Sequence, residues 1–322
     1  MMSDSFCKLN CWLGRNMFLV VLTGLLLGFM LRLPDSALLR KLVVLLFAYM
    51  TFITALGTSL KSFANTLRTP WLPLWILILV HIATPFTAWL AGISFYPDDD
   101  YIRIGYLIGA TIPIGVTSII WTALVKGDMA VSLVAVTLDT FLVPIILPVF
   151  FKFVVGKIIP VSYFDMTLDL VLMITLPSIA GMLVHDLTKG RIVGFSQSIG
   201  GATAKLSLLA VILINAALVA PQITWDSAML KLLLVTLLIV ASGYFVGYLG
   251  SYILKERTPE KVLTLVYNVG IRNNASGLVL ALAYFPPAAA IPITLAILYQ
   301  QPLATIIPYL YKRFVKQPAP AN

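Results

Sequence analysis

Seven glycine, polar or charged residues interrupt an otherwise apolar stretch near the end of the chain, VYNVGIRNNASGLVLALAYF at residues 266–285. They are Asn268, Gly270, Arg272, Asn273, Asn274, Ser276 and Gly277. An arginine at the centre of a membrane helix costs about 2.5–3.5 kcal/mol on insertion scales. Such a cost favours a binding site over a polar helix interface, for which asparagine and serine suffice. A guanidinium, amide side chains and freed backbone N–H groups together suit an anion.

Two other ionisable residues, Asp139 and His81, fall deep inside apolar segments. We expect Asp139 to neutralise Arg272, because a charge inside a membrane needs a partner. His81 suits proton coupling, since an ordinary histidine changes charge between about pH 5 and 8. Two plainer interpretations stay open: a static Asp139–Arg272 ion pair, and a hydrogen-bonded interior histidine.

The composition is that of an integral membrane protein. The 322 residues are 60% hydrophobic and 11% charged, and the mean hydropathy is +0.98, whereas soluble domains carry about 25% charged residues. The net charge of +9 is spread singly over short loops, which indicates membrane topology rather than a nucleic-acid partner. Cys7 and Cys11 lack further ligands nearby and predict no metal site.

Apolar segments of membrane-spanning length recur along the whole chain and predict ten transmembrane helices. The expected spans are 17–34, 42–60, 71–92, 102–125, 129–152, 166–187, 203–221, 229–254, 262–284 and 288–311. Glycines and prolines recur at a near-constant offset of 153 to 155 residues: Gly28 and Gly181, Gly92 and Gly247, Gly115 and Gly270, Pro148 and Pro302. This offset predicts two five-span repeats, about 15–155 and 165–313. Because five is odd, the second would enter the membrane inverted, as in many secondary transporters.

The offset also pairs two interrupted spans. Span four contains GATIPIGVTSIIWT, in which Pro113 lacks an N–H and Gly115 tolerates non-helical backbone. In span nine, Gly270 and Gly277 bracket the polar run. We expect both helices to be broken at mid-membrane, since unwound backbone is tolerated where it lines a cavity.

Lysine and arginine counts predict that both termini lie in the cytoplasm. With the N-terminus inside, fourteen basic residues fall on the inner side and seven on the outer side. The inner set is Lys8, Arg15, Lys61, Arg68, Lys126, Lys189, Arg191, Lys205, Lys255, Arg257, Lys261, Lys312, Arg313 and Lys316. The outer set is Arg32, Arg40, Lys41, Arg103, Lys152, Lys157 and Lys231.

The stretches NVGIRNNASGLVLA, IPIGVTSIIWTALVKGD followed by MAVSLVAVT, and VHIATPFTAWLAG resemble the bile acid:sodium symporter family. The resemblance extends over the whole ten-span layout. It implies a panel domain from helices 1, 2, 6 and 7 and a core domain from helices 3–5 and 8–10, with helices 4 and 9 crossing at their breaks. It also implies alternating-access transport of an organic anion, such as a bile acid or a pantoate-like carboxylate.

The positions that match the family's sodium ligands differ here. An acidic residue and a glutamine of span nine are matched by Asn268 and Arg272, and a glutamine of span three by His81. In span four the Ser-Asn pair becomes Ser118-Ile119. Ser132 matches another ligand, and Thr137 a further one with a one-residue shift. Two like charges about 4 Å apart repel by about 4 kcal/mol at an effective dielectric of 20, so Arg272 would exclude sodium.

We therefore predict a transporter, not an enzyme, that binds its anion through Thr117, Ser118, Asn268, Arg272, Asn273 and Asn274. Coupling or ion pairing would involve His81, Ser132, Thr137, Asp139 and Arg272, with Ser118, Ser132 and Asn268 as residual sodium-site positions. A relocated sodium site from Ser118, Ser132, Thr137 and Asp139 is the alternative, and an intramembrane enzyme or a channel is the second.

No cofactor is expected, and sodium stays an open possibility. The expected partners are the lipid bilayer and the organic anion, with no nucleic acid. The expected form is a monomer or weak homo-oligomer in a bacterial-type inner membrane.

Overall fold

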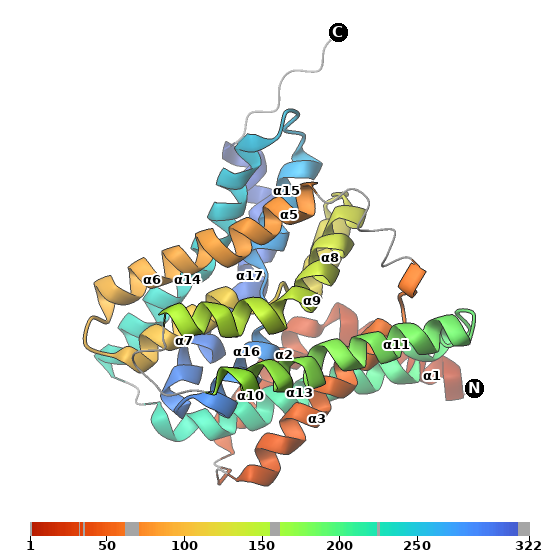
Figure 1. The fold of residues 1–322 in the computed structure, drawn as a ribbon, viewed down its shortest axis with the longest axis horizontal. Coiled ribbons are helices and arrows are strands. Elements are labelled where there is room, and N and C mark those ends of the chain that lie inside the picture. The colour runs from red at the N-terminus through yellow and green to blue at the C-terminus, as the bar shows by residue number, and fades with distance from the viewer. Residues whose placement is uncertain are drawn as a thin grey trace.

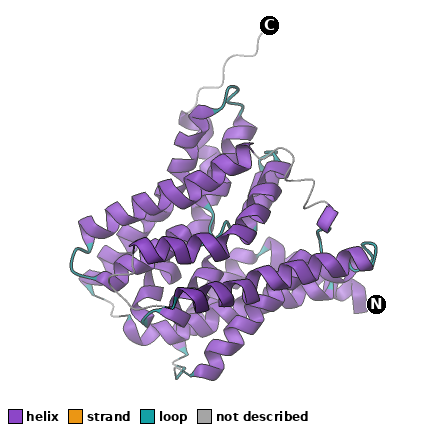
Figure 2. Ribbon diagram, in the orientation of Figure 1, coloured by secondary structure: helices purple, strands orange, loops and turns teal. Residues whose placement is uncertain are grey.

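The computed structural model describes residues 2–31, 33–34, 36–61, 71–154, 162–223 and 226–314. Within these ranges the named elements are helices joined by loops and turns, with no named β-strand (Figure 2). Four of the basic residues used for topology, Arg32, Arg68, Lys157 and Lys316, lie outside the described residues. The all-helical fold class is thus confirmed.

The first half of the chain begins with α1 (Met2–Arg15), which is bent by 79° against α2 (Met17–Met30). The helices that follow are α3 (Ala37–Ala55), α5 (Trp71–Ile78), the π-helix η1 (Leu79–Ala83), α6 (Thr84–Phe95), α7 (Asp100–Thr111), α8 (Thr117–Leu124) and α9 (Met129–Val154). Helices α5, η1 and α6 form one continuous segment, Trp71–Phe95.

In the second half, α10 (Tyr163–Leu170), the π-helix η2 (Val171–Thr175) and α11 (Leu176–Leu187) also form one continuous segment. They are followed by α12 (Val193–Gln197), α13 (Ile199–Val219), the 3₁₀ turn η3 (Ala220–Gln222), α14 (Ser227–Gly250) and η4 (Ser251–Ile253). The chain ends with α15 (Pro259–Gly270), α16 (Asn274–Tyr284), η5 (Pro287–Ala290) and α17 (Ile291–Phe314).

Among the described residues, seven helices are long and apolar enough to cross a membrane, or eight when the bent pair α1–α2 is one span. The two predicted broken spans fail the length criterion because each is divided into two short helices. Helices α7 and α8 are separated at Ile112–Val116, and helices α15 and α16 at Ile271–Asn273. The multi-pass character is therefore plain from helix length and composition.

Three local expectations were wrong. The second span begins at Ala37 rather than at residue 42, because the Ser36 side chain caps it by accepting from the Leu39 N–H at 3.3 Å. Arg40 then lies inside the helix and donates to the backbone carbonyl of Leu282. Gly277 does not border the second break but lies within α16.

The helices fall into two groups that meet along the length of the molecule. Helices α2, α3, α11 and α13 pack on one another in the lower part of Figure 1, and α14 packs on α15, α6 and α17 above them. Helix α16 lies between the groups and contacts α3, α7, α13 and α17.

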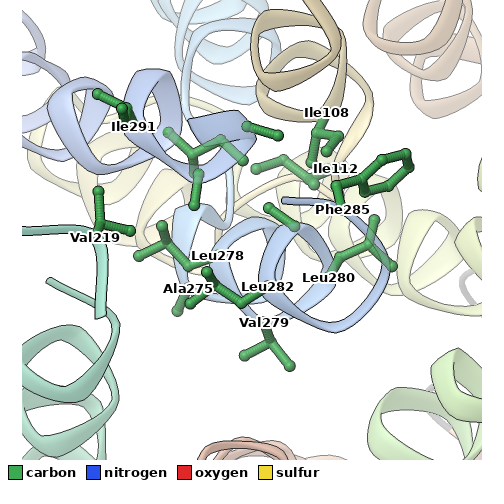
Figure 3. Packing of buried hydrophobic residues seen from close by; sticks show 14 of the residues in the cluster. Ile108, Ile112, Val219, Ala275, Leu278, Val279, Leu280, Leu282, Phe285 and Ile291 are labelled. Atoms are coloured by element: carbon green, nitrogen blue, oxygen red, sulfur yellow. The ribbon is translucent and has the colours of Figure 1, made fainter. Parts of the chain in front are cut away.

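The core around α16 explains how a helix of only 11 residues is held in place. Its residues are almost all buried, and from Leu278 to Leu282 they are apolar on every side, which is typical of a helix enclosed by others. In Figure 3, Leu278, Leu280 and Leu282 of α16 lie among Ile108 and Ile112 of the first broken span and Ile291 of α17. The two breaks are thus fixed by apolar packing immediately beside them.

Candidate functional site

The two helix breaks pair with each other through their backbones. Ile114 and Arg272 form an isolated antiparallel β-bridge. The Gly115 N–H donates to the Ile271 carbonyl at 2.9 Å, and the Asn273 N–H donates to the Pro113 carbonyl at 2.8 Å. Each unwound segment therefore satisfies polar groups of the other, which would be costly to leave unpaired away from water.

Gly115 serves this pairing by its small size rather than by an unusual backbone angle. A Cβ at this position would lie 2.9 Å from the Arg272 carbonyl oxygen, which is closer than real Cβ contacts. Its φ angle is not in the left-handed region, since Lys126, Lys189 and Gly190 are the positive-φ residues of the described chain. The prediction that span four breaks is correct. Glycine is needed at position 115 because the backbone of Arg272 approaches too closely to leave room for a side chain.

Asp139 of α9 stabilises the first break and binds His81. One carboxylate oxygen accepts the Ile114 N–H at 2.6 Å, and the other lies 2.6 Å from His81 Nε2. Both side chains are buried, with 0% and 7% exposure. His81 stands in the π-helix η1, a deviation that often marks functional sites. Its other ring nitrogen, Nδ1, is buried without a hydrogen-bond partner.

The expected direct ion pair between Asp139 and Arg272 does not form within 4 Å; the partner of Asp139 is His81. Arg272 Nη2 instead donates to Thr84 Oγ1 at 2.7 Å and lies 3.5 Å from the Val80 carbonyl oxygen. Nη1 is buried without a partner. Asp139 acts on Arg272 only through longer-range electrostatics.

Gln300 of α17 braces the second break. It accepts from the Arg272 backbone N–H at 2.9 Å and donates to the Arg272 carbonyl at 3.0 Å. The same amide oxygen accepts from Asn274 Nδ2 at 3.0 Å. Gln300 was not among the predicted site residues. The polar Gln300-Gln301-Pro302 element inside an apolar span was the signal that could have found it.

The residual sodium-site positions form a closed hydrogen-bond network. Ser118 Oγ donates to Asn268 Oδ1 at 3.2 Å, and Asn268 Nδ2 donates to Ser132 Oγ at 2.6 Å and to the Thr264 carbonyl at 2.8 Å. Ser132 Oγ contacts Thr122 Oγ1 at 3.0 Å. A sodium ion needs oxygen atoms that point inward around it, whereas here an amide N–H₂ group stands among them. In this arrangement, the Asn268 N–H₂ group points toward Ser132, where a sodium ligand would have to present an oxygen.

A cavity of about 490 Å³ opens beside the second break, between the two groups of helices. Of the six predicted anion-binding residues, Thr117, Arg272, Asn273 and Asn274 line it, whereas Ser118 and Asn268 lie behind the wall in the network described above. Thr137 also lines the cavity, and its hydroxyl donates to the Leu133 carbonyl at 2.6 Å. The proposed relocated sodium ligands are thus divided between the cavity, the network and the His81 contact.

The local electrostatics of the cavity favour an anion. Arg272 is its charged group at the break, and α8 and α16 both begin there, at Thr117 and Asn274. Helix N-termini carry partial positive charge, which attracts negative groups within the first turn. Lys205 of α13 also lines the cavity and was not a predicted ligand. The count of lysine and arginine residues had placed Lys205 at the inner membrane surface.

Comparison with known proteins places the chain among membrane transporters. A family model described as "Sodium Bile acid symporter family" matches residues 43–225. The chain is 31% identical over 274 residues to the protein YbaS of Bacillus subtilis, covering 85% of this chain and 89% of YbaS. It is also 24% identical to the sodium-dependent transporter YocS of Bacillus subtilis, covering 90% and 88% of the two chains.

A plant relative is similar over a smaller share of its length. The probable chloroplastic sodium/metabolite cotransporter BASS2 of rice is 24% identical over 250 residues, which are 74% of this chain and 56% of that protein. The family consists of transporters rather than enzymes. This chain therefore belongs to the sodium bile acid symporter family.

Proposed function

We propose that the protein is a secondary transporter of an organic anion, either a small or an amphipathic carboxylate, that works by alternating access. The observation that carries this proposal is Arg272, which is one of the residues that line the cavity and whose Nη1 is buried without a protein partner. A carboxylate would complete its hydrogen bonding, because charge-assisted bonds to guanidinium are strong and directional. Asn273 and Thr117 line the same wall and offer further donors.

The proposed architecture is ten membrane spans in an inverted five-plus-five repeat. Counting each broken pair, α7–α8 and α15–α16, as one span adds two to the eight counted by length. Close glycine contacts support the repeat. Gly28 of span one packs against Leu213 of span seven, and Gly181 of span six packs against Phe52 of span two. Exchanging the two halves of the chain exchanges these contacts, as an inverted repeat predicts.

Alternating access would then be a movement of the panel domain, helices α2, α3, α10–α11 and α13, against the core domain that carries the crossing. The cavity lies between these groups and is lined by residues of both. Relative displacement of two rigid bundles about a fixed site is the general mechanism of such transporters.

We further propose that transport does not use the family's usual two sodium sites. Arg272 supplies a fixed positive charge, and Asn268 closes the second set of positions into a hydrogen-bond network. Sodium coupling through relocated ligands is the alternative, and the printed names of the relatives YocS and BASS2 favour it. The convergence of Asp139 Oδ1 on His81 Nε2 favours a proton instead, with His81 as the coupling residue.

The proposed location is a bacterial-type plasma membrane, with both termini in the cytoplasm and a monomer or weak homo-oligomer as the working unit. The two Bacillus relatives support the cellular setting, and the twofold excess of basic residues on one side supports the orientation.

Thermal stability in lipid nanodiscs tests the proposed function. A ligand that binds only the folded protein raises the melting temperature, by an amount that grows with the logarithm of its concentration relative to its dissociation constant. Cholate, pantoate and octanoate are suitable probes, with the neutral amides of the same acids as controls. The proposal predicts stabilisation by at least one carboxylate and by none of the amides. Stabilisation by none of a broad range of carboxylates, or equal stabilisation by the amides, would refute anion binding at Arg272.

A further inference from the structure

Lys205 is a charged residue inside a membrane-spanning helix. It is the seventh residue of α13, one of the helices long and apolar enough to cross the bilayer. A lysine in such a helix is costly, and it marks a functional site when it faces a cavity instead of lipid. Lys205 lines the same cavity of about 490 Å³ as Arg272.

Among the described residues, the hydrogen-bond partners of the Lys205 ammonium group are neutral. Nζ donates to the side-chain oxygen of Asn10 on α1 and lies 3.5 Å from the Gly201 carbonyl oxygen. Asn10 is itself fixed, because its amide donates to the Gln197 carbonyl at 2.6 Å. Lys205 takes part in none of the ion pairs found among the described residues. Its position is therefore organised, and none of the described residues supplies a counter-ion for its charge.

Two cationic residues thus line one cavity whose described lining includes no aspartate or glutamate. Arg272 belongs to the broken span and Lys205 to the facing group of helices. Charges of one sign in a cleft with low-dielectric walls reinforce each other and raise the local concentration of the opposite charge. A ligand with a single acid group would neutralise only one of them.

The cavity is long enough to separate two acid groups. Gly201 and Ile212 both line it and are eleven positions apart on α13, which corresponds to about 16 Å along a helix. Lys205 lies one turn from Gly201, whereas Arg272 lies at the crossing of the two breaks. Apolar residues, including Phe47, fill the wall of the same cavity.

From these observations we propose that Lys205 is a second anion-binding residue and that the substrate is an elongated dianion, such as a dicarboxylate with an apolar spacer. One acid group binds at Arg272 and the other at Lys205. This inference rests on the proposed function and narrows it, since an organic anion with one acid group would satisfy the function without using Lys205.

Suberate and octanoate test the inference, because both have eight carbons and they differ in the second carboxylate. Their dissociation constants for the full chain in nanodiscs are measured by calorimetry at one ionic strength. The wild-type protein should bind suberate at least about tenfold more tightly than octanoate, which is the usual worth of a charge-assisted hydrogen bond. In Lys205→Gln this ratio should fall to about one, and Lys205→Arg should restore it.

Lys189→Gln is the matched control, since it removes one exposed positive charge that does not line the cavity; the ratio should stay at the wild-type value. A wild-type ratio near one, or a preference that survives in Lys205→Gln, would overturn the role of Lys205 while octanoate binding still supported the proposed function. Failure of both acids to bind would count against the function itself.

Discussion

The backbone N–H of Ile114 donates a 2.6 Å hydrogen bond to the carboxylate of Asp139. Ile114 lies in the break of the fourth span, where the helical acceptor for this N–H is lost. The other oxygen of the carboxylate lies 2.6 Å from His81 Nε2. A single buried side chain therefore stabilises the unwound backbone and contacts a residue that can carry a proton.

Replacing Asp139 should separate its two roles. Asp139→Asn keeps an oxygen for the Ile114 N–H and places an N–H₂ group toward His81, whereas Asp139→Leu removes both partners. Loss of one partner of a buried charged pair costs about 3–5 kcal/mol, so we expect Asp139→Leu to unfold at a much lower temperature than Asp139→Asn. Circular dichroism melts in nanodiscs measure the difference. Equal melting temperatures would show that the Ile114 contact contributes little.

Arg272 should determine anion affinity. In Arg272→Gln the positive charge disappears, and the loss of a charged hydrogen bond corresponds to at least about tenfold weaker carboxylate binding. Arg272→Lys keeps the charge but loses the planar guanidinium with its paired N–H donors. Its affinity for the carboxylate should therefore lie between those of the wild type and Arg272→Gln. Calorimetric titration measures the dissociation constant of cholate for each of the three proteins and so ranks their affinities. Unchanged affinity in Arg272→Gln would place the carboxylate elsewhere.

Restoring the family's sodium ligands should create a sodium response. The resemblance to sodium-coupled members implies an acidic residue at Asn268 and a glutamine at Arg272. The double substitution Asn268→Glu with Arg272→Gln removes the fixed positive charge and supplies a carboxylate, so sodium but not potassium should raise the melting temperature. Each single variant serves as a control and should respond less. A double variant without a sodium response would mean that other positions also differ.

Gln300 and Gln301 form a matched pair for testing the brace of the second break. Gln300→Leu leaves the Arg272 N–H and carbonyl without their partners, and each buried unsatisfied group costs about 1–3 kcal/mol. Gln301→Leu removes only the acceptor of the Trp121 indole N–H, now 2.8 Å away. Gln300→Leu should therefore lower the melting temperature more. The reverse order would contradict the bracing role.

Proton coupling through His81 predicts a specific pH dependence. If one proton binds with each anion, carboxylate affinity falls about tenfold for each pH unit once the proton site is mostly empty in the free protein. His81→Gln should abolish that slope. His185→Gln should keep it, because His185 lies at the end of α11 beside Asp186. A slope that is the same in all three proteins would assign the pH effect to the ligand or to another residue.

The broken helices could be predicted from the sequence because proline, glycine and an arginine in an apolar span all violate the rules of a membrane helix. The partners across the breaks could not be predicted. The expected pairing of Arg272 with Asp139 rested on charge alone. In the structure, Asp139 instead contacts His81 and accepts a hydrogen bond from the backbone N–H of Ile114. A backbone donor freed by unwinding has no signature in the side-chain sequence.

Residues of ordinary appearance were also missed. Thr84, which accepts from Arg272, is one of many threonines in the chain. Lys205 was assigned to the inner surface because counting of basic residues does not reveal which side of a helix faces a cavity. The first predicted element begins at residue 17, although the 14 residues before it that form α1 are helical and their Asn10 accepts a hydrogen bond from Lys205.

In the proposed mechanism, Arg272 and the Asn268 network replace the sodium ions of the family, so that the anion binds without sodium. The direct measurement is the dissociation constant of cholate for the wild-type protein in nanodiscs, in sodium chloride and in potassium chloride at equal ionic strength. We predict the same constant in both salts. Tighter binding in sodium by about tenfold or more would show that the two ligands are linked and would contradict the claim.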